Sequence, residues 1–149
     1  MSEKPWAHLP NAKHIDAVLA DVNVRPEAWD TAWTTERGVA WDTAWYVARN
    51  AAWIAARDAA WIAARDAAWG AAWDTARTIL QGAAWYVARG AVRDTLSALI
   101  AWDDSADLLD YTPDVLRAMI DLAEPPVCHQ AALLLPYAIV RSNAKQEVT

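Results

Sequence analysis

Five residues in the middle of the chain alternate between an aromatic ring and a positive charge. They are Trp53, Arg57, Trp61, Arg65 and Trp69, and we call this set the Trp/Arg ladder. Residues four apart are neighbours on a helix, so each guanidinium can stack on an indole. Indole can also stack on a nucleobase, and guanidinium can pair with phosphate. The ladder is therefore the candidate site for a small, anionic, aromatic ligand such as a nucleotide.

The ladder has a second interpretation as packing. Tryptophan buries a large area, and an arginine stem can lie along apolar surface with its charge in solvent. Asp58 and Asp66 follow the two arginines and offset their charge. If a ligand does bind, Arg57 and Arg65 lie about 12 Å apart along a helix axis, which favours a dinucleotide over a single phosphate. Both interpretations stay open at this stage.

Other residues with chemical potential have weaker patterns. Asp103, Asp107 and Asp110 would share one face of a helix and could bind a hard cation, although a solvated acidic turn explains them better. Cys128 and His129 are adjacent, so on a helix they point about 100° apart, which is poor geometry for a shared metal. The chain has no phosphate-binding glycine loop, nucleophile elbow or zinc spacing. We expect a protein that is not an enzyme and has no metal or cofactor.

The ladder belongs to a tetrapeptide repeat that spans residues 27–94. Every fourth residue from Trp29 to Arg93 is Trp or Arg, Gln81 excepted, and alanine usually precedes it. A period of four excludes strands, and alanine favours helix. Because every fourth residue drifts by about 40° around a helix, the tract must break into several helices or be wrapped on all sides. The candidate breaks are Gly38, Gly70, Gly82 and Gly90.

We expect an uninterrupted central helix from Val39 to Trp69 and a second repeat helix at about 83–101. Before the repeat come an arm (1–10), pinned by Trp6, and a helix to about Val22 with Asn11 as its N-cap. Pro26 suits a first helical position. The segments after the repeat are an acidic segment (98–124), a helix from Thr112-Pro113 to about 123, a helix at about 127–140 split or kinked by Pro136, and a polar tail (142–149).

The pattern predicts an all-α fold. We expect a single compact helical domain (1–149) in which central Ala/Trp/Arg repeat helices are wrapped by the N- and C-terminal helices. Trp53 and Trp61 lie in the middle of the tract, so we expect them to be more buried than Trp6.

Charge and composition limit the partners. The net charge is −6 and the imbalance lies in the acidic segment, which argues against binding to duplex nucleic acid. Arg and Asp interrupt the apolar tract, so no membrane span is expected. A single cysteine, Cys128, fits a reducing cytoplasm.

The Ala-Ala-Trp-Asp and Ala-Ala-Arg-Asp units resemble the repeats of uncharacterised Ala/Trp-rich tetrapeptide-repeat proteins of high-GC actinobacteria and their phages. The stretches Ala-Trp-Asp-Asp (101–104) and Leu-Leu-Leu-Pro (133–136) are similar to the downstream part of such proteins. The resemblance implies a phage or accessory-genome setting, where small non-enzymatic proteins often act by binding and blocking a target.

Two functions follow from these observations. The first is a small non-catalytic binding protein that sequesters a nucleotide-like ligand at the ladder or inhibits a host protein. The alternative is a structural homo-oligomeric assembly protein in which the ladder is only packing. Its basis is that one small domain cannot easily hide so many tryptophan faces.

Overall fold

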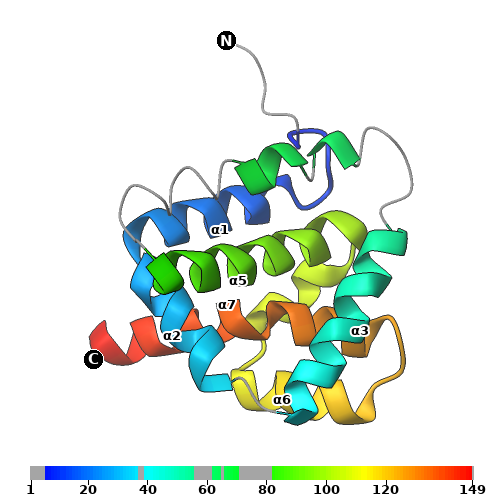
Figure 1. Ribbon diagram of the computed structural model, residues 1–149. Coiled ribbons are helices and arrows are strands. Elements are labelled where there is room, and N and C mark those ends of the chain that lie inside the picture. The colour runs from blue at the N-terminus through cyan, green and yellow to red at the C-terminus, as the bar shows by residue number, and fades with distance from the viewer. Residues whose placement is uncertain (1–5, 37–38, 56–61, 65, 71–81, 149) are drawn as a thin grey trace.

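The computed structural model describes residues 6–36, 39–55, 62–64, 66–70 and 82–148, and within these ranges the chain forms helices and the turns between them (Figure 1). The all-α and compact character of the fold is confirmed. Among the described helices, none is both long and apolar enough to cross a membrane. The elements are α1 (Ala12–Val24), α2 (Pro26–Glu36), α3 (Val39–Ala55), α5 (Gly82–Ala101), the 3₁₀ helix η1 (Ser105–Asp110), α6 (Pro113–Leu122) and α7 (Val127–Val148). Residues 62–64 and 66–70 are also helical.

Two helix starts follow directly from local chemistry. Pro26 begins α2, where its missing N–H has no helical partner to lose. Thr112 caps α6 by accepting a hydrogen bond from the backbone N–H of Val115 at 3.3 Å, and Pro113 occupies the first turn. Both starts were expected, and so was the second repeat helix, which is α5. Gly90 lies inside α5 and does not break it.

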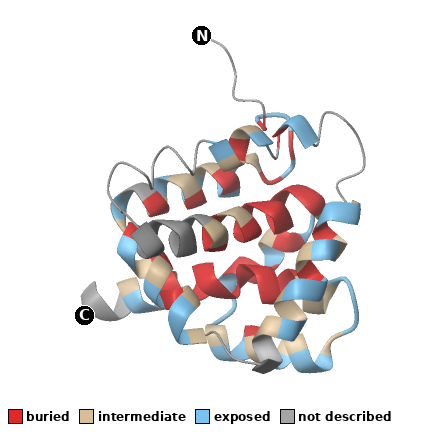
Figure 2. Cartoon of the chain, viewed as in Figure 1, coloured by how far each residue is buried: buried red, intermediate tan, exposed pale blue. Residues whose placement is uncertain are grey.

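Helix α7 lies in the interior of the fold. Every residue from Gln130 to Val140 is buried, and α7 contacts α2, α3, α5, α6 and η1 (Figure 2). We expected the terminal helices to wrap around the repeat helices, and α7 does not fit this expectation. Its large aliphatic side chains gain more free energy from burial than the alanines of the repeat. The helix also continues past Pro136 to Val148, so the expected polar tail is helical up to that residue.

The second half of α5 packs against α7. From Ala91 to Ala101 every residue except Arg93 is buried. The Thr95 hydroxyl donates to the backbone carbonyl of Leu133 at 3.1 Å, which ties the two helices together. The core around this contact consists mainly of aliphatic side chains, among them Leu96, Leu99, Ile100, Leu133, Leu134 and Leu135.

The N-terminal arm is fixed by two polar side chains. Trp6 is 5% exposed, and its indole N–H donates to Asp16 at 2.9 Å. Asn11 makes no side-chain cap on α1, contrary to expectation. Its amide donates instead to the carbonyls of Leu99 at 2.8 Å and Trp102 at 3.1 Å. Carbonyls at a helix end lack intrahelical partners, so the Asn11 NH2 group is held at the end of α5, and the side-chain oxygen makes no cap on α1.

The tryptophans of the repeat are buried to very different degrees. Trp29 is fully buried, stacks on Tyr137 with ring centroids 5.4 Å apart, and donates to Asp21 at 2.9 Å. Trp53, in contrast, is 47% exposed, so the expectation that it is more buried than Trp6 is wrong. On α3 the buried side chains are Ala48 and Ala52, whose small size lets the helix approach its neighbours and leaves the ring at the edge. Trp61 lies outside the described residues.

The expected uninterrupted helix from Val39 to Trp69 is also wrong. The ring centroids of Trp53 and Trp69 are 5.8 Å apart. Sixteen residues of straight helix would separate them by about 24 Å along the axis. These two tryptophans therefore meet across two helical segments.

Truncation of Trp29 tests the burial pattern. We expect Trp29→Ala to lower the free energy of unfolding by roughly 3–5 kcal/mol, because a large buried ring and its hydrogen bond to Asp21 are lost. Leu122→Ala serves as the control, since Leu122 is 84% exposed on α6 and its loss should change stability by less than about 0.5 kcal/mol. Urea unfolding followed by circular dichroism measures both. Equal effects for the two variants would contradict the arrangement described here.

Candidate functional site

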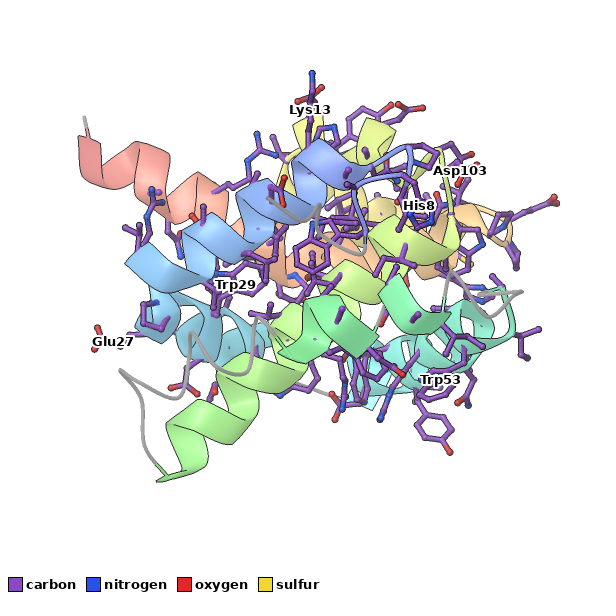
Figure 3. All side chains as sticks on the ribbon, turned by 90° about the horizontal axis from the view of Figure 1, so that it is seen from above. His8, Lys13, Glu27, Trp29, Trp53 and Asp103 are labelled. Atoms are coloured by element: carbon purple, nitrogen blue, oxygen red, sulfur yellow. The ribbon has the colours of Figure 1, made fainter. Side chains whose placement is uncertain are left out.

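Described members of the repeat gather where α2, α3, α5 and residues 66–70 meet. We call this group the Trp/Arg cluster, and it contains Trp33, Trp45, Arg49, Trp53, Trp69, Arg93 and Asp94. Figure 3 shows Trp53 at the periphery of the molecule and Trp29, which is not part of the cluster, in the interior. The cluster thus runs from a buried carboxylate outward to a half-exposed ring.

Asp94 is the buried end of the cluster. Its carboxylate accepts hydrogen bonds from the Trp45 indole N–H at 2.7 Å and from Arg93 Nε at 3.3 Å. Burial raises the pKa of Asp94 above its ordinary value of 3.8, although the charges of Arg93 and Arg49 and the hydrogen bonds from Trp45 and Arg93 act in the opposite direction. Because Trp45 belongs to α3 and Asp94 to α5, this carboxylate joins the two helices.

The rings and guanidinium groups of the cluster contact one another. Arg49 lies over the ring of Trp45 at 5.7 Å, and Arg93 lies over the ring of Trp69 at 5.8 Å. Trp33 meets Trp45 edge to face, with centroids 4.8 Å apart. Each of these geometries is favourable for an aromatic ring with a cation or a second ring. The cluster can therefore hold the elements that contribute to it together through non-covalent contacts between side chains.

The structure brings together two of the five predicted ligand-binding residues. Trp53 and Trp69 form a tilted ring pair with an interplanar angle of 59°. Arg57, Trp61 and Arg65 lie outside the described residues, so their part of the predicted site stays a prediction.

Two arginines and a buried aspartate accompany this ring pair, and none of the three was predicted as a site residue. Arg49 and Arg93 occupy repeat positions, and the repeat register was the signal that could have suggested them. Register does not show which repeats meet in space, however. Asp94 gave no signal, because its neighbours in the sequence do not reveal that it is buried against Trp45.

None of the other candidate residues belongs to the cluster. Asp103, Asp107 and Asp110 are exposed, and in the part of the chain that the structure describes no three His, Cys, Asp or Glu side chains are grouped to hold a metal ion. Cys128 and His129 are half-buried at the start of α7, and burial lowers the pKa of His129.

Two adjoining cavities of about 150 and 280 Å³ lie beside the start of α6 and share Thr112, Pro113 and Ser142. Arg117 lines the larger cavity and Arg141 the smaller. Arg117 pairs with Glu36 and Asp114, each at 2.7 Å, while Arg141 donates to the Leu109 carbonyl. The positive charge in these cavities is already engaged, which gives a ligand little to bind.

Replacement of Asp94 tests the buried carboxylate. At pH values between 3.8 and the raised pKa, Asp94 is protonated in the folded chain but ionised in the unfolded chain. In this pH range the free energy of unfolding therefore falls as pH rises. Asp94→Asn keeps an oxygen for the Trp45 N–H but cannot ionise. We therefore expect its stability, relative to wild type, to increase as pH rises through this window.

Urea unfolding at pH 4, 5, 6 and 7 measures the effect. Asp107→Asn, which removes an exposed negative charge, is the control for the change in net charge. Parallel stability curves for wild type and Asp94→Asn would contradict the raised pKa.

Comparison of the chain with protein-family models, with curated proteins and with solved structures found no match. The function is therefore inferred from the residues of this chain and their geometry.

Proposed function

We propose that the protein is a non-catalytic helical assembly protein that self-associates through one side of α3. This side, the α3 outer face, consists of Tyr46, Val47, Asn50, Trp53 and Ile54. The observation that carries the proposal is the exposure of its four large apolar side chains. Tyr46 is 60% exposed, Val47 50%, Trp53 47% and Ile54 81%.

The spacing of these residues makes them one surface. Side chains three and four apart share a side of a helix, whereas Ala48 and Ala52, on the other side of α3, are buried. None of the five carries a formal charge. Contiguous apolar surface of this kind marks interaction sites in soluble proteins, while isolated exposed apolar residues do not.

The internal contacts of the Trp/Arg cluster favour assembly over ligand binding. Arg49 and Arg93 lie on the rings of Trp45 and Trp69, and both reduce the electrostatic cost of the buried Asp94. A phosphate would have to compete with this carboxylate for the same guanidinium groups. The cluster is better suited to hold α3 in place, so that its outer face is presented rigidly.

The setting of the protein is part of the proposal. A phage or accessory-genome origin rests on the resemblance of the repeat, and a cytoplasmic location rests on the single Cys128. In such a setting a small protein can act without catalysis, either by binding to copies of itself or by binding to another protein.

Self-association tests the assembly function. We expect the average mass in sedimentation velocity to rise above 16.4 kDa between 1 and about 100 μM. Ile54→Glu should weaken association by at least about tenfold, because it puts a charge into an apolar contact. Leu122→Glu is the matched control, since Leu122 is as exposed as Ile54 but lies on α6. A wild-type chain that stays monomeric, or equal weakening by both variants, would contradict the proposal.

The second candidate function is binding of an anionic aromatic ligand at the ladder. The observation that favours it is the half-exposed Trp53 ring on Trp69, with Arg93 5.8 Å from the Trp69 ring. A base could stack on the exposed ring while a phosphate approaches a guanidinium. This arrangement would suit a nucleotide-like molecule.

A fluorescence titration tests the ligand. If it binds, mono-, di- or cyclic nucleotides should quench the intrinsic tryptophan emission saturably and more weakly at high salt. Trp53→Ala, Arg57→Ala and Arg65→Ala should abolish the quenching, while Arg117→Ala, an arginine outside the cluster, should leave it unchanged. Absence of quenching at millimolar nucleotide would rule the ligand out.

A further inference from the structure

We propose that the partner of the α3 outer face is a second copy of the chain, whose α3 packs antiparallel about a two-fold axis at Asn50. This inference rests on the proposed self-assembly and specifies its geometry. It concerns which residues meet, so it can fail while self-assembly itself holds.

The outer face is symmetric about Asn50. Tyr46 and Val47 precede Asn50 by four and three residues, and Trp53 and Ile54 follow it by three and four. A two-fold axis at Asn50 therefore brings Tyr46 onto Ile54 of the second copy, and Val47 onto Trp53 of the second copy. Each aromatic ring then meets a branched aliphatic side chain, twice over. A dimer contact of this type requires the same patch to be complementary to itself, and this spacing meets the requirement.

The uncharged polar side chain of Asn50 suits a position on the two-fold axis. Asn50 is exposed in the single chain and would become buried where the two helices cross. Its amide has both donors and acceptors, so two copies can hydrogen-bond to each other and leave no unsatisfied polar group. A lysine or glutamate at this position would repel its own copy.

The size of the face predicts a weak dimer. With aromatic side chains of about 150–250 Å², the four apolar residues expose on the order of 500 Å² per chain, or about 1,000 Å² for two copies. This area is at the lower limit for a specific interface, so we expect association in the micromolar range. The Trp45–Asp94 hydrogen bond and the Trp53–Trp69 contact hold the face in place before binding, which reduces the ordering that association requires.

A charge exchange tests the antiparallel register. Tyr46→Lys and Ile54→Glu should each weaken dimerisation by at least about tenfold, so that at the wild-type dissociation constant the average mass falls toward 16.4 kDa. The double variant should dimerise again, because the antiparallel contact places Lys against Glu on both sides of the axis. In a parallel pairing each charge would face its own kind, and the double variant would stay monomeric. Both positions are exposed, and circular dichroism checks that each variant is folded.

A cross-link tests the axis itself. In a Cys128→Ser background, Asn50→Cys should form an intermolecular disulfide on mild oxidation, since helices packed 8–10 Å apart bring facing Cα atoms within disulfide range. Ala63→Cys, exposed and outside the face, is the control and should not cross-link.

The outcomes separate the two proposals. A wild-type chain that stays at 16.4 kDa overturns both. Self-association without rescue by the double variant, or without the disulfide, overturns the Asn50 axis alone.

Discussion

A four-residue repeat cannot keep its large side chains on one face of an α-helix, and much of this structure follows from that constraint. Each repeat moves the ring by about 40° around the axis. The drift is visible in α2, where Trp29 is fully buried and Trp33 is half-buried. It is visible again in α3, where Trp45 reaches the buried Asp94 and Trp53 lies half in solvent. Rings on one helix therefore differ in burial, because each lies at a different angle to the core.

The buried rings bring a second requirement, because an indole N–H in the interior needs an acceptor. Three described tryptophans meet it in the same way. Trp6 donates to Asp16, Trp29 to Asp21 and Trp45 to Asp94, at 2.7–2.9 Å. Helix α1 supplies two of these carboxylates and α5 the third. Aspartates that lie outside the acidic segment therefore help to fix where these three tryptophans lie.

The sequence predicts the local features of this fold but not which side chains are buried. Alanine content, Pro26 and the Thr112-Pro113 pair act locally, so the all-α fold, the start of α2, α5 and the start of α6 could be read from the sequence. Burial is decided by partners instead. Asn11 was expected to cap α1, yet its amide donates to the Leu99 carbonyl near the end of α5.

The candidate site shows the same limit. The pattern singled out Trp53 and Trp69, and these rings meet across two segments and not along one helix. The involvement of Arg93 and Asp94 depends on how α3 packs against α5, which no local pattern contains. The four-residue period identified the residue types of the cluster. Which of these residues contact one another is known only from the fold.

The proposed self-association uses a ring that this drift leaves exposed. Trp53, which this drift leaves half in solvent, joins the exposed Tyr46, Val47 and Ile54 in one apolar surface with a fixed spacing along α3. On α3 this spacing is the same in both directions from Asn50. Every copy of the chain carries this surface, so a complementary partner is present wherever the protein is made, and no second protein has to match it. The buried end of the cluster fixes α3 through Trp45 and Asp94, and the exposed end can then pair with itself.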